Sequence, residues 1–531
     1  MSSRLTIRIE RWASFALVVL VIALFALQCS SLFVFPQPNS LRWYGDETWL
    51  MSEAKTQITT GTVRYPLAIG STLDHSKGLA LSMTWLSAVL YGLPAAAVTA
   101  DPVAVGRVVT AVLAAILLVT AYRSARALGA SSLAALIGVA LLASTRAFVF
   151  SSHSCRTDLL AGLVVLLFLS SMTQLFAIQK ERSQIWWIGY GAVVVFLAVS
   201  SSIHLLTLLG PVAIFLAWRF GGFGTFRLAF ATIIGALSTL VLLTIVSWLT
   251  NGTLTLFTPG AHQFQDVLSS IPILRPLSRS VQSANILIRL KQFFAEAPAV
   301  FLLVLLTPFA WQSSKQRAKA SSLLIALVII FLSWLLFEGA EINYLMQVVP
   351  VIFLAIALAL SRISSKNKVI EYAAAAIAIV FIGISGQDML RASANAHVID
   401  RSNASAISAI ASHIDTSWHR PGAPLILVEP PALERMSQYP NLRVMTDHFI
   451  SFSEREIPTD SFLRQEHVNY AVLYNSPKFP KDRARVDSLY RTVRRIGTLI
   501  AYEAGRSGDI GRNYFGRSEW QDTLLLFKLP E

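Results

Sequence analysis

The sequence contains few charged residues. Asp, Glu, Lys and Arg make up 14% of its 531 residues, whereas 54% are hydrophobic. A soluble core of this length cannot use so much apolar material, and the mean hydropathy of +0.58 points the same way. The composition therefore excludes an ordinary soluble protein and indicates that lipid solvates much of the chain.

Recognisable catalytic and redox motifs are also missing. The two cysteines, Cys29 and Cys155, lie far apart and form no metal or redox motif, so they leave the compartment open. The polar C-terminal part contains no Gly-rich phosphate loop and no nucleophile elbow, which favours a binding or shielding role there. Internal repeats, which many transporters have, are not detected.

Basic residues outnumber acidic ones and give a net charge of +14. They gather in short clusters at the ends of apolar segments instead of on one face, which indicates membrane orientation and argues against a nucleic-acid partner. Arg4, Arg8 and Arg11 precede the first apolar segment, which has no clear cleavage site. That segment is therefore expected to be a retained first span with a cytoplasmic N-terminus.

Apolar stretches close to the roughly 20 residues needed to cross a bilayer recur up to residue 386. Hydrocarbon forces their backbone groups to pair internally, so each is expected to be a helix. The segment 79–97 does not fit the charge pattern, because a full crossing would put Arg123 and Arg126 on the wrong side. It is tilted, re-entrant or interfacial, or it crosses against the rule, so we expect about 11–13 membrane helices. The spans that satisfy every basic cluster are 12–35, 103–122, 131–150, 158–178, 185–201, 203–218, 228–250, 297–311, 320–337, 342–361 and 369–386.

Hydropathy falls and charge rises from about residue 390, which predicts two domains. Residues 1–389 form a polytopic α-helical membrane domain, and residues 390–531 form a small soluble α/β domain on the extracytoplasmic, periplasmic side of the inner (plasma) membrane. In the second domain, residues 404–413 are expected to be helical, and the expected strands are 424–428, 470–474 and 523–529.

The first outside loop, residues 36–78, holds acidic, basic and aromatic residues beside the membrane. Asp46 and Glu47 open an amphipathic helix running toward Thr60, and adjacent carboxylates on a helix point in different directions. One can therefore face a reaction centre while the other takes a structural or metal partner. The alternative is that Asp46 caps the helix and Glu47 complements its dipole.

Cationic groups follow in the same loop. Arg64, His75 and Lys77 could hold the anionic phosphate of a lipid carrier. The alternative is contact with anionic lipid headgroups, because basic residues gather at membrane surfaces.

Further polar residues interrupt the later apolar segments. Arg156 and Asp158 lie in a short loop that our topology places outside, where Asp158 either contributes to a site or caps the next helix and pairs with Arg156. His204 lies at a break between two short apolar helices and is either a phosphate ligand or a packing residue. Tyr344 follows another short outside turn, which is equally consistent with a simple solvated turn.

The order of these motifs resembles the GT-C glycosyltransferases. In particular, it is similar to the branch that contains protein O-mannosyltransferases and the aminoarabinose transferases of bacterial lipid A. Ser76-Lys77-Gly78-Leu79 lacks the prolines of the family's Lys-Pro-Pro-Leu-like motif, whereas residues 344–350 are similar to its Tyr-Leu-Leu-Pro-x-x-Pro stretch. The other matching features are Gly45-Asp46-Glu47, Thr60-Gly61, Tyr65-Pro66, Gly106-Arg107-Val108 and Arg156-Thr157-Asp158-Leu159-Leu160.

The resemblance implies an inverting transfer of a sugar from a polyprenyl-phosphate donor to an acceptor glycan, lipid or protein at the outer membrane face. Some family members use a divalent metal ion, but a single Asp-Glu pair does not establish one here. The residues implied as catalytic are Asp46, Glu47 and Asp158, and those implied in binding the lipid phosphate are Arg64, His75, Lys77, Arg107, Arg156, His204 and Tyr344.

Two other functions fit a polytopic basic chain. A transporter or flippase of a lipid-linked or anionic substrate would place its polar groups near the membrane midplane, often in repeated halves. A noncatalytic scaffold would leave the loop around Asp46 and Glu47 without a purpose. The gathering of polar groups at one face favours the enzyme.

Overall fold

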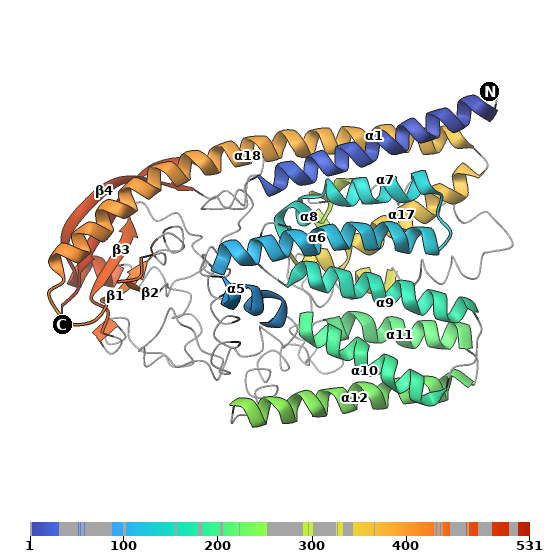
Figure 1. Ribbon diagram of the computed structural model, residues 1–531, viewed down its shortest axis with the longest axis horizontal. Coiled ribbons are helices and arrows are strands. Elements are labelled where there is room, and N and C mark those ends of the chain that lie inside the picture. The colour runs from blue at the N-terminus through green and yellow to red at the C-terminus, as the bar shows by residue number, and fades with distance from the viewer. Residues whose placement is uncertain are drawn as a thin grey trace.

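The computed structural model shows a bundle of helices with a five-stranded sheet beyond one end (Figure 1). We call the end of the bundle nearer the sheet the sheet end, and the other the N-terminal end. The structure describes residues 3–30, 51, 54, 58, 88–98, 102–152, 154–155, 157–178, 183–201, 205–221, 224–251, 290–291, 293–295, 297–300, 325, 328–332, 343–365, 367–428, 432, 436, 439–445, 463–464, 467–475, 491–508 and 519–530.

Most of the described chain is α-helical. The long helices are α1 (Ser3–Cys29), α6 (Pro102–Ala127), α7 (Ser132–Ala143), α9 (Asp158–Ile178), α10 (Gln184–Ser201), α11 (Leu205–Gly221), α12 (Gly224–Asn251), α17 (Val349–Ser364) and α18 (Lys368–Ser417). Shorter elements are η2 (Ala88–Gly92), α5 (Leu93–Ala97), α8 (Arg146–Ser151), η4 (Pro298–Val300) and η5 (Asn343–Gln347).

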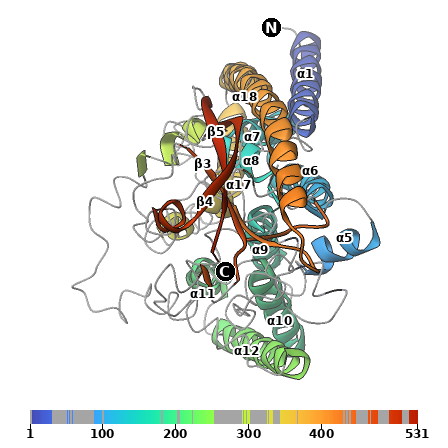
Figure 2. The same cartoon turned by 90° about the vertical axis from the view of Figure 1, so that its left-hand side faces the viewer.

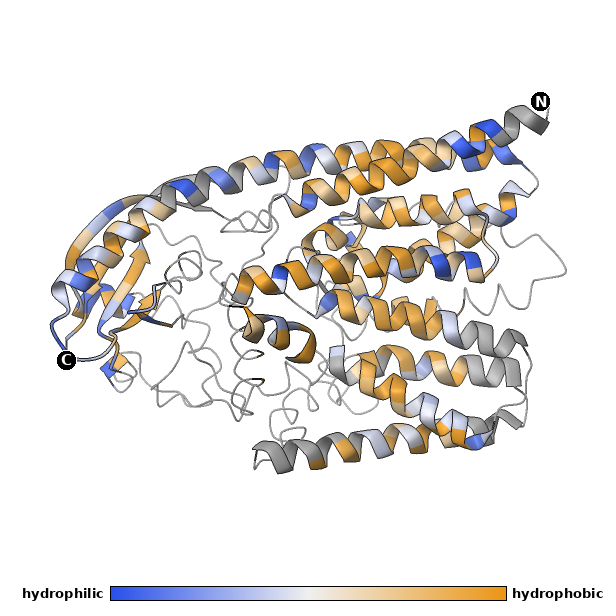
Figure 3. Cartoon of the chain, viewed as in Figure 1, coloured by the Kyte–Doolittle hydropathy of each residue, from blue (hydrophilic) through white to orange (hydrophobic). Residues whose placement is uncertain are grey.

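Apolar residues cover these helices along most of their length (Figure 3). Among the described residues, four helical segments are long and apolar enough to cross a bilayer, namely Arg8–Cys29, Val103–Ala127, Leu345–Ser364 and Lys368–Arg391. The chain is therefore a multi-pass membrane protein. In Figure 2, α1 and α18 lie together on one side of the bundle, and the packed pair α10 and α12 lies on the opposite side.

Close helix packing depends on small residues at the contacts. A Cβ added to Gly138 of α7 would lie 2.9 Å from the Phe353 carbonyl oxygen of α17. Glycine lets helix backbones approach to this distance in lipid, where no hydrophobic effect drives helices together.

The expected span 131–150 is broken into α7 and α8. The Ser144 hydroxyl donates to the Leu141 carbonyl at 2.9 Å, and the Thr145 hydroxyl donates to the Leu142 carbonyl at 2.8 Å. Thr145 also caps α8, because its Oγ1 accepts from the Phe148 amide at 3.2 Å. The two side chains thus supplement the backbone hydrogen bonds at the break, where Ser144 pairs the Leu141 carbonyl and Thr145 pairs the Phe148 amide.

The segment 79–97 is described from residue 88 onward. This part forms the π-helical turn η2 and the five-residue helix α5, which together are too short to cross a bilayer. Residues 79–87 lie outside the described residues, so whether the whole segment crosses the bilayer stays a prediction.

Helix α18 connects the bundle to the sheet and runs through 50 residues. The sequence predicts a span to residue 386 and a separate helix at 404–413, but the backbone remains helical between them. Beyond the bundle, Ile407, Ile410 and Ile414 recur at helical spacing and are buried against the sheet. One rigid element therefore carries the sheet.

The sheet has the order β2-β1-β3-β5-β4. Strands β1 and β3 pair in parallel, and β5 is antiparallel to both β3 and β4. The expected strands at 424–428, 470–474 and 523–529 correspond to β1, β3 and β5. The strands are β1 (Leu425–Val428), β2 (Arg443–Met445), β3 (Tyr470–Tyr474), β4 (Thr498–Gly508) and β5 (Glu519–Lys528).

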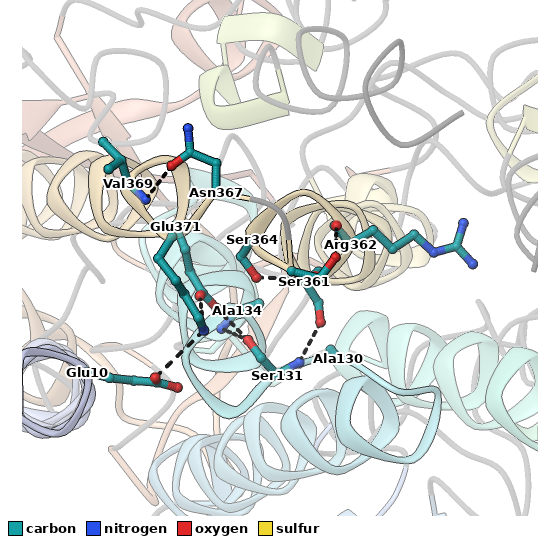
Figure 4. Close-up of polar contacts among 12 residues, drawn as sticks. Glu10, Ala130, Ser131, Ala134, Ser361, Arg362, Ser364, Asn367, Val369 and Glu371 are labelled. Atoms are coloured by element: carbon teal, nitrogen blue, oxygen red, sulfur yellow. Dashed lines mark hydrogen bonds and ion pairs between the residues drawn. The ribbon is translucent and has the colours of Figure 1, made fainter. Parts of the chain in front are cut away.

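A buried carboxylate joins four helices at the N-terminal end (Figure 4). Glu371 of α18 is fully buried, and its Oε2 lies 2.8 Å from the Lys368 ammonium. The hydroxyl of Ser131, the N-cap of α7, donates to Glu371 Oε1, and the Ser131 amide donates to the Ser361 hydroxyl of α17 at 2.8 Å. Lys368 also lies 3.6 Å from Glu10 of α1. The network fixes the root of α18.

Replacing Glu371 with leucine is expected to lower the free energy of unfolding by about 2 kcal/mol, because it removes the acceptor for Ser131 and the buried partner of Lys368. Thermal unfolding of the purified protein in detergent would measure the loss. The control is Glu10→Gln, whose ion pair with Lys368 is longer and partly exposed. We expect that change to cost under about 0.5 kcal/mol. A Glu371→Leu protein that unfolds at the wild-type temperature would contradict the structural role.

Candidate active site

Two of the predicted site residues are buried charged side chains at the sheet end of the bundle. Arg107 lies near the start of α6 and is 0% exposed, and Asp158 is the first residue of α9 and is 5% exposed. Figure 1 shows the starts of both helices at the sheet end. Charged groups are costly in this environment, so buried charges at this end of the bundle are candidates for a functional site.

Gly106 brings three distant chain segments together beside Arg107. A Cβ added to Gly106 would collide with the Met51 sulfur and lie 2.8 Å from Cys155 Sγ. Cys155 also donates its thiol proton to the Val103 carbonyl at 3.1 Å. The segment that leads into α9 at Asp158 is thereby fixed to the start of α6. We call the contact of Met51, Gly106 and Cys155 the Gly106 seam.

The chain that follows the Asp46-Glu47 pair packs against this seam. Met51, Ala54 and Ile58 are helical, and their spacing of three and four residues places them on one face. Met51 and Ala54 are fully buried. Gly92 packs directly against Ala54, and an added Cβ there would lie 2.8 Å from Ile58 Cγ1. These three positions are helical, as the expected helix requires, whereas its start at Asp46 and Glu47 lies outside the described residues.

Hydrogen bonds connect η2 to the same part of α6. The Tyr91 hydroxyl lies 3.3 Å from the Thr110 hydroxyl, which donates to the Gly106 carbonyl at 2.9 Å. Both Tyr91 and Thr110 are completely buried. This chain of contacts fixes the backbone position of Gly106 from a second direction.

The element that contains Tyr344 contacts α9 from the late part of the chain. A Cβ added to Gly162 of α9 would lie 2.5 Å from the Met346 carbonyl oxygen of η5. Gly162 is one helical turn beyond Asp158 and therefore lies on the same face of α9. Four segments that the sequence singled out thus meet at the sheet end.

The other predicted residues cannot be placed from this structure. The side chain of Tyr344 is not described, although its backbone belongs to η5. The positions that lie outside the described residues are Asp46, Glu47, Arg64, His75, Lys77, Arg156 and His204.

A second group of buried polar residues, which sequence reasoning missed, lies around α8. Asp388 of α18 is 4% exposed, and the charges of Arg146 and Arg391 act on its carboxylate. Val149 of α8 packs with Met389 of α18 and Leu27 of α1. Arg146 is an ionisable residue inside a continuous apolar stretch, and that signal could have identified this group.

Gln28 connects the end of α1 to the loop before α9. It is 1% exposed, and its Nε2 donates to the Ala143 carbonyl at 3.4 Å. Its Oε1 accepts from the Ser152 hydroxyl at 3.3 Å. The amide therefore joins the end of α7 to the segment that leads to Asp158.

The described residues do not form a metal-binding cluster. Among them, no three His, Cys, Asp or Glu side chains converge as metal ligands. The buried charged residues at the starts of α6 and α9, Arg107 and Asp158, include a single carboxylate, which does not fit a multivalent cation on these residues alone.

Solved structures with the same fold are known. The chain is similar to ArnT from Cupriavidus metallidurans bound to undecaprenyl phosphate, with a TM-score of 0.57 and 14% identity over 96% of this chain and 97% of that chain. It is also similar to the archaeal oligosaccharyltransferase AglB from Archaeoglobus fulgidus in complex with an inhibitory peptide and a dolichol-phosphate. The TM-score there is 0.51, with 12% identity over 93% of this chain and 79% of that chain.

Both proteins are GT-C glycosyltransferases, so this chain has the GT-C fold that its motifs predicted. No protein-family model and no curated protein matches the sequence. At these identities the structural similarity defines the fold alone.

The close contacts of the Gly106 seam lead to a prediction about the thermal stability of the protein. Alanine normally stabilises a helix by about 0.5–1 kcal/mol relative to glycine, but at Gly106 its Cβ would overlap Met51 and Cys155. We expect Gly106→Ala to lower the thermal unfolding temperature in detergent.

The matched control is Gly189→Ala in α10, where an added Cβ meets no atom within 4 Å. This variant should unfold at or above the wild-type temperature. If Gly106→Ala were as stable as Gly189→Ala, the close approach of the three segments would be refuted.

Proposed function

We propose that this protein is an inverting glycosyltransferase that moves a sugar from a polyprenyl-phosphate donor to an acceptor at the extracytoplasmic face of the membrane. The observation that carries the proposal is the Gly106 seam. It joins the helix that follows Asp46 and Glu47 to the buried Arg107 and to the segment that begins α9 at Asp158.

The fold supports this chemistry. GT-C neighbours include a protein bound to undecaprenyl phosphate and one in complex with a dolichol-phosphate, which are polyprenyl phosphates of two kinds. A lipid-linked donor needs an apolar bundle for its chain and cationic groups near the membrane surface for its phosphate. The apolar bundle supports the first requirement, and the buried Arg107 supports the second.

In the proposed reaction, the Asp46 carboxylate accepts the proton of the acceptor hydroxyl as its oxygen attacks the anomeric carbon. The bond between that carbon and the phosphate oxygen breaks, and its electron pair leaves with the polyprenyl phosphate. Glu47 supports the geometry of the site or contacts the acceptor. Asp158 orients the cationic side chains of the site. Inversion follows from attack opposite the leaving group.

Cationic side chains stabilise the leaving group. Negative charge on the phosphate oxygens grows as the glycosidic bond lengthens. Fixed positive charges in a water-poor site stabilise this developing charge strongly. Arg107 is proposed as one of these cations. The others are Arg64, His75, Lys77, Arg156 and His204, and Tyr344 is proposed as a hydrogen-bond donor to the phosphate.

The positions of the buried charges favour an enzyme over a transporter. In the described part of the chain, the buried charged side chains are Arg107, Asp158, Glu371 and Asp388. Arg107 and Asp158 lie near helix starts at the sheet end, whereas Glu371 lies in the first turn of α18. Asp388 follows Glu371 by about 25 Å of helix, which places it toward the sheet end. A transporter would be expected to hold such groups near the midplane.

We also propose the domain roles and the sidedness. Residues 1–389 are assigned as the catalytic membrane domain, with a cytoplasmic N-terminus. Residues 390–531 are assigned as an extracytoplasmic domain that shields or completes the site, because the long helix α18 projects the sheet from the end of the bundle where Arg107 and Asp158 lie.

The base assignment predicts the effect of one substitution. Asp46→Asn should leave the protein folded and inserted but reduce sugar transfer at least about a hundredfold, because an amide cannot accept the proton. The measurement is transfer of radiolabelled sugar from polyprenyl-phosphate donors to cell-envelope acceptors in membranes that contain equal amounts of each protein.

Glu503→Gln is the control, because Glu503 is a partly exposed carboxylate of β4. It should keep wild-type activity. Full transfer by Asp46→Asn would reject the base, and an absence of transfer by the wild type from every polyprenyl-phosphate donor would reject the proposed function.

A further inference from the structure

The amide of Gln347 is buried without a hydrogen-bond partner. Gln347 ends η5 and is 1% exposed, and neither its Nε2 nor its Oε1 meets a partner within the described chain. Ser151, the last residue of α8, is also 1% exposed, and its hydroxyl is equally unpaired there. A buried polar group of this kind destabilises a fold, so its presence requires an explanation.

These unpaired groups belong to elements that adjoin the candidate site. Helix η5 packs against both α8 and α9. Its Met346 carbonyl contacts α9 at Gly162, one turn beyond Asp158. Gln347 therefore lies at the sheet end of the bundle, next to the elements that the proposed reaction uses.

The same end of the bundle contains a buried glutamine that is fully paired. Gln28 is also 1% exposed, but its amide donates to Ala143 and accepts from Ser152. The fold can thus satisfy a buried amide in this region. Among the described residues, Gln347 is the one that has two buried side-chain polar atoms without a hydrogen-bond partner, and such an unsatisfied group requires an explanation.

Sequence pattern also makes Gln347 unusual. It stands at the first proline position of the Tyr-Leu-Leu-Pro-x-x-Pro stretch that residues 344–350 resemble. This chain therefore has a polar amide where that pattern has an apolar ring without a donor. An amide at this position can hydrogen-bond to a ligand, whereas a proline ring cannot donate to one.

The chemistry of the amide restricts its ligand. Nε2 only donates and Oε1 only accepts, so a group that both accepts and donates is needed to satisfy the side chain. A phosphate without a proton only accepts, whereas a sugar hydroxyl does both. The Ser151 hydroxyl adds one more donor and acceptor on the adjoining helix.

We propose that Gln347, together with Ser151, binds hydroxyl groups of the donor sugar and helps to select which sugar is transferred. The proposal rests on the proposed function and names the part of the donor that this side chain recognises. Because both side chains are closed off from solvent, the sugar reaches them when η5 and α8 separate on binding.

The first experiment compares stability at the two buried glutamines. Gln347→Met keeps the length of the side chain and removes its unpaired polar atoms, so thermal unfolding without ligand should occur at or above the wild-type temperature. Gln28→Met breaks two hydrogen bonds and should unfold at a lower temperature. A Gln347→Met protein that loses as much stability as Gln28→Met would show that the amide is paired within the fold, and would overturn the proposal.

The second experiment measures binding of undecaprenyl phosphate alone and of undecaprenyl phosphate linked to glucose, mannose, galactose, N-acetylglucosamine or 4-amino-4-deoxyarabinose. Wild type should prefer at least one sugar-linked lipid to the bare phosphate. Gln347→Met should bind the bare phosphate normally and lose about tenfold in affinity for the preferred sugar-linked lipid. Ser151→Ala should reduce the same preference.

The outcomes separate this proposal from the proposed function. If wild type binds none of these lipids, the proposed function fails. If wild type binds undecaprenyl phosphate but shows no preference for any linked sugar, or if Gln347→Met keeps the wild-type preference, the role of Gln347 is wrong while donor binding stands.

Discussion

The membrane part of this structure depends on one constraint, which is that hydrocarbon offers no hydrogen bonds. Backbone groups are therefore paired within helices, and polar side chains must find partners inside the bundle or lie near its ends. The network around Glu371 meets this constraint at the N-terminal end by joining α1, α7, α17 and α18. Because α18 also carries the sheet, fixing its root fixes the direction in which the sheet projects from the bundle.

At the sheet end, the same constraint concentrates polar chemistry into a small region. The Gly106 seam brings three segments into contact beside Arg107, and η5 adds a fourth through Gly162. Close packing at glycines lets charged residues such as Arg107 and Asp158 stay buried while remaining near a membrane surface. In the proposed function, a lipid-linked substrate presents its apolar chain to the bundle and its phosphate to this region.

The sequence predicted much of the architecture from hydropathy and charge. Helix α9 and strands β1 and β3 agree closely with their expected ranges, because long apolar runs and short buried strands leave clear patterns. Hydropathy did not reveal the break at Ser144 and Thr145, where side chains replace backbone partners within an apolar stretch. It also missed the continuity of α18, since a helix can persist where its surroundings change from lipid to water. The approach of Met51 and Cys155 to Gly106 required tertiary structure, and the unpaired amide of Gln347 left no sequence signal beyond its place in a motif.

The central claim is spatial, and a cryo-electron microscopy map of the full chain with bound undecaprenyl phosphate would test it most directly. The account predicts phosphate density at the sheet end, between the starts of α6 and α9, within hydrogen-bonding reach of Arg107 and close to the Asp46 carboxylate. Phosphate density beside Lys368 at the N-terminal end, or an Asp46 side chain on the same side of the membrane as the start of α1, would contradict it.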